Sequence, residues 1–454
     1  MSPVRAKAGT RHPGFGRKVS AGYFPAMIRT VRILELTRFW APLQATWLMM
    51  AVEGPFLAAM IARMAEPKHN LAAYGVAFAL AILVEAPVIM MMSAATALVD
   101  GADNFRKLRN FMLMLNGGIT SAMLLLLLTP AWGLVTDGAM NLDPEVARLV
   151  RTSLFILLPW PAAIGLRRFY QGVLIRSGRT QLVAWGTAIR LSGMGLTAMA
   201  AYRWTPLEGA WAGAAGLSAG VVSEAAASWL MARPAVREVT GAPSLRPLGY
   251  REIERFYRPL ALTSVISLAV QPLVTFFMGL ARYPLESLAV LPVVTSLVFI
   301  FRTPGLSFQE AAITMLGRTW DNAPMVRRFA VILGAGAGTG LAVMAWTPLA
   351  GVWLHSVAGL SPDLAAFALP PIRILVLMPP LSVLLSLQRA LMVARRDTGP
   401  ITWASVLEVA GIAAVLVVAV PLGHWVGATA AAVAFLIGRL ASNIFLLRGM
   451  GRVG

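Results

Sequence analysis

Long apolar runs alternate with short polar and basic connections along almost the whole chain. A helix needs about 20 apolar residues to cross the ~30 Å hydrocarbon core of a bilayer, and twelve runs reach that length. They predict twelve transmembrane helices, and therefore an all-α, polytopic membrane protein. The predicted spans are 39–62, 71–98, 111–135, 149–173, 181–202, 206–231, 257–281, 287–316, 329–354, 364–388, 400–420 and 424–447.

Several of these runs contain proline, which removes a backbone donor and bends a helix. Membrane bundles accept such bends where neighbouring groups satisfy the freed carbonyl. The prolines therefore predict bends inside the spans rather than ends of spans. They are Pro55, Pro87, Pro159, Pro161, Pro272, Pro304, Pro379 and Pro380.

Composition supports a membrane protein and excludes several kinds of chemistry. Of the 454 residues, 58% are hydrophobic and 13% are charged, whereas soluble domains carry about 25% charged residues. The chain has no cysteine, so disulfides, iron–sulfur clusters and Cys-ligated zinc are excluded, and its four histidines have no metal-ligand spacing. No Walker A, nucleophile-elbow or zincin pattern is present. We expect neither a cofactor nor a metal, and we expect that the protein is not an enzyme.

Positive charge is distributed unevenly between the two sets of connections. The N-terminal tail and the alternate connections after it carry 29 of the 39 Lys and Arg residues, while the other set carries five. Cytoplasmic loops hold the Lys/Arg excess, so we expect both termini in the cytoplasm and the protein in the inner, cytoplasmic membrane. The net charge of +19 is then explained by anionic lipid, without a nucleic-acid partner. A transit peptide is the alternative interpretation of the tail.

The chain resembles itself at an offset of 217 or 218 residues. Pro42 falls on Pro259, and Trp185 falls on Trp403. Each half then contains six spans, and an even number returns the chain to the same side, so the halves are parallel repeats. Transporters built this way bind substrate near the midplane between the halves. The predicted organisation is a basic cytoplasmic tail (1–38), an N-lobe (39–231), a helix-poor cytoplasmic connector (232–256), a C-lobe (257–447) and a cytoplasmic C-terminus (448–454).

Ionisable residues inside the spans are costly to insert and are candidates for function. The repeat places opposite charges at equivalent positions in the two halves: Glu85 matches Arg302, and Arg190 matches Glu408. One interpretation is structural, because buried charges need compensation, and pairs these residues with each other. The other is functional and counts Arg190 and Glu408 among the substrate-binding candidates.

Two arginines beside prolines are the strongest candidates for binding an anion. Arg302 and Arg373 could form a positive centre, because an arginine fork binds carboxylate or phosphate through two hydrogen bonds. Glu53 and Glu85 lie in the middle of spans of the first half, where desolvation favours the protonated carboxyl. They are the candidates for coupling to protons, and hydrogen bonding to a neighbouring helix is the alternative.

Three segments resemble the progressive ankylosis (ANK) proteins. They are Leu71-Ala72-Ala73-Tyr74-Gly75-Val76-Ala77 followed by Pro87; Pro371-Ile372-Arg373-Ile374 with Pro379 and Pro380; and Pro421-Leu422-Gly423 with Gly427-Ala428-Thr429. The wider superfamily contains multidrug-and-toxin extrusion (MATE) proteins and lipid-linked oligosaccharide flippases. The resemblance implies twelve helices in two six-helix lobes around a central cavity, and export of citrate, nucleotide or pyrophosphate. Arg373 stands on the family's motif.

Four functions follow from these observations. The first is a secondary-active, alternating-access exporter of small anions, which we expect to act as a monomer in the lipid bilayer. The second is a cation-drug antiporter driven by protons or sodium, whose cavity should be acidic and aromatic. The third is a lipid-linked sugar flippase, and the fourth is a membrane scaffold that transports nothing.

Overall fold

The computed structural model describes residues 33–179, 181–244, 247–316, 322–395 and 399–451. Within these residues the regular structure is helical, and the β-structure is limited to one bridge between Arg282 and Val426. Most of the predicted basic tail and the last residues of the predicted C-terminus lie outside this part of the chain. The first half contains α1 (Ile33–Ile61), α2 (Pro67–Glu85), α3 (Met91–Leu98), α4 (Ala102–Leu128), α5 (Ala131–Gly133), the π-helical turn η1 (Leu134–Ala139), α6 (Pro144–Ile156), α7 (Trp160–Arg176), α8 (Gln181–Trp204) and α9 (Gly209–Thr240).

The second half repeats this order of elements. α6, α7, α8 and α9 begin at residues 144, 160, 181 and 209, and their counterparts begin 218 residues later. The duplication inferred from the sequence is therefore present in the structure. The second half contains α10 (Tyr250–Leu268), α11 (Val270–Gly279), α12 (Pro284–Leu316), α13 (Ala323–Trp346), α14 (Leu349–Gly351), η3 (Val352–Val357), α15 (Pro362–Ile374), η4 (Leu375–Leu377), α16 (Met378–Ala394), α17 (Gly399–Val417), η5 (Val418–Leu422) and α18 (Gly427–Gly451).

Each predicted span coincides with one helix or with a broken pair of helices. Prolines lie at two of the breaks, Pro87 between α2 and α3 and Pro159 before α7, whereas Pro304 lies inside the continuous α12. Nine helical segments of the described chain are long and apolar enough to cross a membrane. The other three predicted spans fall on α1, α8 and α9. These helices carry Glu53, Arg190 and Glu224, whose charges lower their mean hydropathy.

The connector predicted at 232–256 is mostly helical, so its description as helix-poor is wrong. α9 continues to Thr240 and α10 begins at Tyr250. Two residues between them contact the start of α4: the Asn104 amide N donates to Ser244 Oγ, and the Leu248 amide N donates to Asn104 Oδ1. Gly101 permits this close approach, because a Cβ there would lie 2.5 Å from the backbone of Ser244. The described residues Ser244 and Leu248 of the connector therefore contact the first half.

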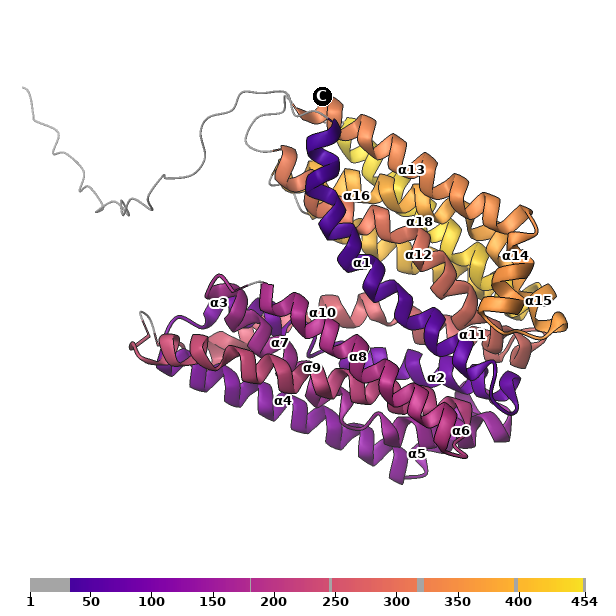
Figure 1. Cartoon of the computed structure of the whole chain (residues 1–454), viewed down its shortest axis with the longest axis horizontal. Helices are drawn as coiled ribbons and strands as arrows, with labels where there is room; N and C mark the ends of the chain where they lie inside the picture. The colour runs from indigo at the N-terminus through magenta and orange to yellow at the C-terminus, as the bar shows by residue number, and fades with distance from the viewer. Residues whose placement is uncertain (1–32, 180, 245–246, 317–321, 396–398, 452–454) are drawn as a thin grey trace, which may run out of the picture.

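The helices form two lobes, and the first helix of each half packs partly on the other lobe (Figure 1). α1 crosses between the lobes. In its first part Leu36 is buried in a cluster of C-lobe side chains, and Trp40 Nε1 donates to Ser307 Oγ of α12 at 2.8 Å. In the opposite direction, Tyr257 of α10 is buried in the N-lobe and donates to the Pro87 carbonyl oxygen. This exchange differs from the predicted division, in which each half forms its own lobe.

The lobes meet where α2 and α12 begin, which we call the joined end, and their helices diverge away from it (Figure 1). Lys68 Nζ lies 2.6 Å from Glu286 Oε1, and Arg63 Nη2 donates to the Ser356 carbonyl oxygen at 2.5 Å. Lys68 and Glu286 are 218 residues apart, which is the offset of the repeat. One equivalent position therefore carries opposite charges and joins the two halves.

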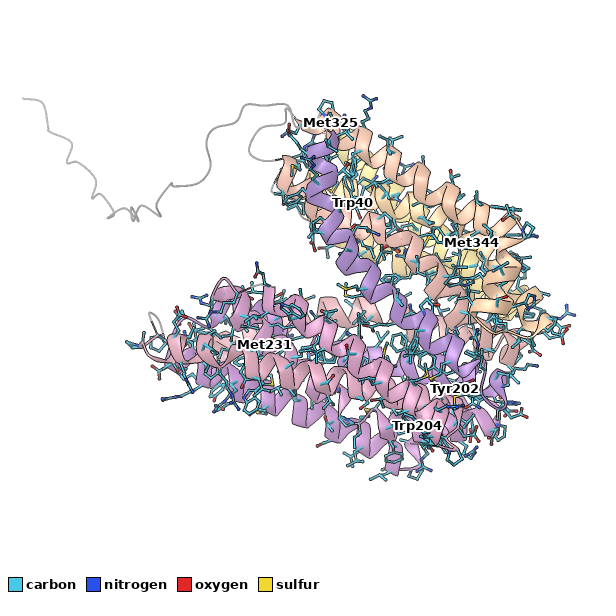
Figure 2. The ribbon with its side chains drawn as sticks, in the orientation of Figure 1. Trp40, Tyr202, Trp204, Met231, Met325 and Met344 are labelled. Carbon is cyan, nitrogen blue, oxygen red and sulfur yellow. The ribbon has the colours of Figure 1, made fainter. Side chains whose placement is uncertain are left out.

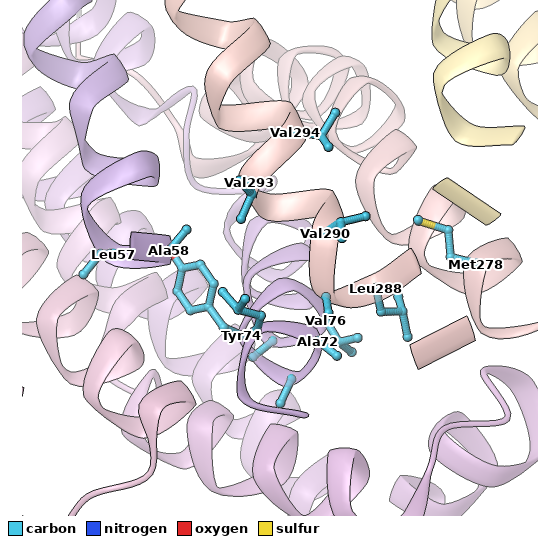
Figure 3. Close-up of a cluster of buried hydrophobic side chains, with 14 of the residues drawn as sticks. Leu57, Ala58, Ala72, Tyr74, Val76, Met278, Leu288, Val290, Val293 and Val294 are labelled. Carbon is cyan, nitrogen blue, oxygen red and sulfur yellow. The ribbon is translucent and has the colours of Figure 1, made fainter. Parts of the chain in front are cut away.

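An apolar core supports the joined end (Figure 3). Small residues let the two helices approach, as is usual in membrane bundles: a Cβ on Gly75 of α2 would lie 2.9 Å from Pro292 Cγ of α12. The core is therefore continuous from one lobe to the other at this end. Its labelled members in Figure 3 are Leu57, Ala58, Ala72, Tyr74, Val76, Met278, Leu288, Val290, Val293 and Val294.

Candidate functional site

A chain of four charged side chains crosses the interior of the N-lobe. Glu224 of α9 is 1% exposed and forms an ion pair with Arg167 of α7. Arg190 of α8 lies 4.0 Å from Glu224 Oε2 through Nη1, and 2.7 Å from Glu53 Oε2 of α1 through Nη2. Gln171 Nε2 also donates to Glu224 Oε1 at 3.1 Å. Two carboxylates and two guanidinium groups thus compensate each other inside the lobe.

Glu85 has a different partner in the same lobe. It is the last residue of α2, before the break that contains Pro87, and it is 8% exposed. Trp160 Nε1, at the start of α7 after the second break, donates to Glu85 Oε2 at 2.5 Å. The two helix breaks therefore bring an indole donor and a carboxyl acceptor together, which satisfies one oxygen of a buried acid.

The C-lobe holds more arginines than acids in its interior. Arg439 of α18 pairs with Glu408 of α17 at 2.8 Å. Arg302 of α12 donates through Nε to Ser382 Oγ at 3.1 Å, and Arg389 of α16 donates to Ser405 Oγ at 3.3 Å. Three guanidinium groups therefore share one carboxylate in this cluster, and two of the three are bonded to hydroxyls rather than to acids.

The sequence pairs do not form. Glu85 accepts a hydrogen bond from Trp160, and Arg302 donates to Ser382. Arg190 pairs with Glu53, and Glu408 pairs with Arg439. The equivalent positions belong to different lobes, and each side chain finds its partner within its own lobe or on α1. The pairing of equivalent positions is therefore not observed, and the N-lobe charges Glu53 and Arg190 pair with each other instead.

Arg302 and Arg373 bind different elements and have different surroundings. Arg373 is exposed on α15, and its Nε donates to the Ala345 carbonyl oxygen near the end of α13. In the N-lobe, Arg151 donates in the same way to the Leu127 carbonyl oxygen near the end of α4. Ala345 and Leu127 are 218 residues apart, so Arg373 and Arg151 bind equivalent helix ends. Such carbonyls carry partial negative charge that attracts a cation.

Two arginines of these clusters are not among the candidates named from the sequence. Arg167 and Arg389 lie near the ends of predicted spans, but α7 and α16 continue past them and turn them inward. A signal was present, because Arg167 and Gln171 are four residues apart and share one helix face, and Gln388 precedes Arg389. Glu224, which is also not among those candidates, lies at the centre of the N-lobe chain.

Within the described residues, no group of three or more His, Asp or Glu side chains could hold a metal ion. No protein-family profile and no curated protein sequence matches the chain.

Solved structures of membrane transporters share its fold. An inward-facing multidrug resistance MATE transporter of the MOP superfamily aligns over 90% of this chain and 94% of its own, with a TM-score of 0.72 and 14% identity. The lipid II flippase MurJ in an inward closed conformation aligns over 91% and 87%, with a TM-score of 0.70 and 13% identity. A MOP superfamily transporter from Pyrococcus furiosus, described as having a binding pocket of reversed polarity, aligns over 93% and 96% at a TM-score of 0.62 and 13% identity.

An outward-facing MATE transporter aligns with a TM-score of 0.59, below the 0.72 of the inward-facing one. The expected fold class is confirmed, while membership of the ANK proteins and of their wider superfamily stays a prediction. The chain is a polytopic membrane protein with the two-lobed fold of the MATE transporters.

Proposed function

We propose that the protein is a secondary-active exporter of small organic or phosphorylated anions that works by alternating access, with its anion site in the C-lobe. The observation that carries this proposal is Arg302. Its guanidinium lies in the middle of α12 and binds the Ser382 hydroxyl, while the nearby carboxylate of Glu408 is taken by Arg439. A guanidinium without a carboxylate partner inside a membrane lobe favours binding of an anion, which would supply the missing charge.

The difference in charge between the two lobes supports a negatively charged substrate. The N-lobe chain contains as many carboxylates as guanidinium groups, whereas the C-lobe cluster contains an excess of guanidinium groups. A site for cationic drugs should instead be acidic. The Pyrococcus furiosus transporter, whose pocket is described as reversed in polarity, is consistent with a fold that accommodates either sign.

The proposed direction follows from the distribution of charge and from the shape. The connections at the joined end belong to the set with few Lys and Arg residues, so this end faces away from the cytoplasm. The diverging ends of the lobes would then open towards the cytoplasm, as in the inward-facing MATE structure that aligns well with this chain. Anions would enter there and leave after the joined end opens.

Glu53 is the proposed coupling residue, with Glu85 as the second candidate. Glu53 Oε2 holds Arg190, while Glu53 Oε1 is buried without a hydrogen-bond partner. Protonation of Glu53 would remove its charge and leave Arg190 to Glu224, which it already approaches at 4.0 Å. Arg167 and Arg190 would then share the carboxylate of Glu224, so a proton would change the contact between α1 and α8.

Transport into proteoliposomes tests the proposed substrate class. We expect the purified full chain to take up labelled citrate, nucleotide or pyrophosphate with saturation, and to transport no cationic dye. A lipid-linked sugar diphosphate, offered in the bilayer, should stay in its leaflet. Dye uptake without anion uptake would show that the protein is a drug antiporter. Movement of the lipid-linked sugar alone would show that it is a flippase.

The ion pair at the joined end should bias the two conformations. Lys68→Glu places like charges opposite each other. Exposed pairs contribute up to about 1 kcal/mol, which corresponds to roughly a fivefold change in the ratio of the open to the closed conformation. The chain has no cysteine, so Ala72→Cys in the apolar core would be its single thiol. We expect that thiol to react about fivefold faster when Lys68→Glu is added.

The control is the double variant Lys68→Glu with Glu286→Lys, which restores the pair in reverse and should return the thiol to its slow reaction. Equal labelling rates in all three proteins would show that this pair does not hold the joined end.

A further inference from the structure

A largely apolar cavity of about 520 Å³ lies near the joined end, between elements of the two lobes. Four elements line it: α1 supplies Phe56 and Ala59, α8 supplies Tyr202, α12 supplies Ile300, and η3 supplies Trp353. The cavity is thus built from both lobes. It is distinct from the charged clusters, because none of the lining residues belongs to them.

One basic side chain completes the lining. Arg63, two residues beyond the end of α1, is exposed and touches the cavity. Its Nη1 donates to the Ala59 carbonyl oxygen and its Nη2 to the Ser356 carbonyl oxygen. These bonds use two of the five N–H groups of a guanidinium. Donors therefore remain for an anion at this end of the cavity.

The cavity has the length of one leaflet of a bilayer. The lining residues on α1 and just beyond its end run from Val52 to Arg63, which is roughly 16 Å at about 1.5 Å per residue. Half of a ~30 Å hydrocarbon core is about 15 Å. Tyr202 and Trp204, at the end of α8 (Figure 2), are 42% and 79% exposed, as expected of aromatic residues at the membrane interface. The cavity therefore reaches from the interface to the middle of the membrane.

We propose that this cavity binds one anionic phospholipid of the leaflet at the joined end, with an acyl chain along α1 and the phosphate at Arg63. Val52, at the end of the lining away from Arg63, is 55% exposed, so the cavity is open at that end. An acyl chain matches both the lining and the length, and a single cation at the interface end selects an anionic head group.

Binding of the lipid would also depend on the conformation of the protein. α1 and α8 line one side of the cavity, while α12 and η3 line the other, and the Arg63–Ser356 hydrogen bond spans the two. Opening the joined end would separate these walls, so a lipid bound here stabilises the closed arrangement. This consequence rests on the proposed alternating access, but the lipid site itself does not.

Native mass spectrometry of the full chain tests the site. With phosphatidylglycerol added, we expect one lipid to be retained, and phosphatidylcholine to be retained less. Arg63→Ala should reduce retention of phosphatidylglycerol about fivefold and should leave phosphatidylcholine unchanged, while Arg63→Lys should keep most of the binding. Ala59→Trp, which fills the cavity, should abolish retention of both lipids.

Two matched variants separate the site from general effects. Arg148→Ala removes another exposed arginine on the side of the membrane where α6 begins, and Leu196→Trp adds an indole to an exposed position of α8 outside the cavity. Both should retain phosphatidylglycerol like the unchanged chain, and thermal melting should show Ala59→Trp folded. Equal retention of the two lipids by the unchanged chain, or full retention by Arg63→Ala and Ala59→Trp, would overturn the proposal.

If retention is unaffected while Ala59→Trp abolishes anion uptake, the cavity serves a transported molecule and the lipid site is refuted. If anion uptake fails in every protein but the lipid pattern holds, only the proposed function is refuted.

Discussion

Arg302→Ala should lower anion uptake into proteoliposomes by roughly tenfold to a hundredfold, because a hydrogen bond between charged groups contributes about 1.5–3 kcal/mol. The guanidinium of Arg302 binds a serine hydroxyl and has no carboxylate of its own, so the variant removes charge from the site without leaving an uncompensated acid. Arg302→Lys should keep part of the activity, since an ammonium keeps the charge but loses the planar fork. The measurement is the initial rate of uptake at equal amounts of reconstituted protein.

Arg373→Ala is the matched comparison in the same lobe. Its guanidinium binds the end of α13, as Arg151 binds the end of α4, so we expect uptake to change less than about twofold and stability to fall by roughly 0.3–1 kcal/mol. The reverse result, with loss of uptake in Arg373→Ala and normal uptake in Arg302→Ala, would move the anion site to α15 and restore the importance of the ANK-like motif.

Glu224→Ala should destabilise the protein by about 3–5 kcal/mol, because removing one partner leaves a buried charge uncompensated. Glu224 binds Arg167 and Gln171 and lies near Arg190, so the variant leaves the N-lobe with excess positive charge. The double variant Arg167→Met with Glu224→Leu should recover much of the loss, since apolar replacements of a buried pair are often tolerated. Reversible unfolding in detergent gives these free energies.

Glu238→Ala is the control on the same helix. Glu238 is exposed and pairs with Arg179 at 3.2 Å, and exposed pairs contribute at most about 1 kcal/mol. Equal effects of Glu224→Ala and Glu238→Ala on the free energy of unfolding would show that the N-lobe chain has no special role in stability.

Helix positions could be predicted from the sequence because their causes are local. Apolar length, prolines such as Pro87 and Pro159, and a repeat offset of about 218 are properties of neighbouring residues, and they placed the spans, two of the breaks and the two halves. The same local information identified Glu53, Arg190 and Arg302 as charges inside the membrane. It mistook the ends of α7 and α9, because basic residues near the end of a span resemble a loop.

Only the tertiary structure decided which charges meet. A partner depends on the rotation of each helix about its axis and on its neighbours in the bundle, and no local pattern contains either. Equivalence in the repeat suggested Arg190 with Glu408, but those positions lie in separate lobes, and α1 brings Glu53 to Arg190 instead. The sequence by itself determined that charged residues lie within the membrane, and in which half of the chain each one lies. Packing determined that the N-lobe pairs its carboxylates with its own arginines, and that Arg302 in the C-lobe has no carboxylate partner.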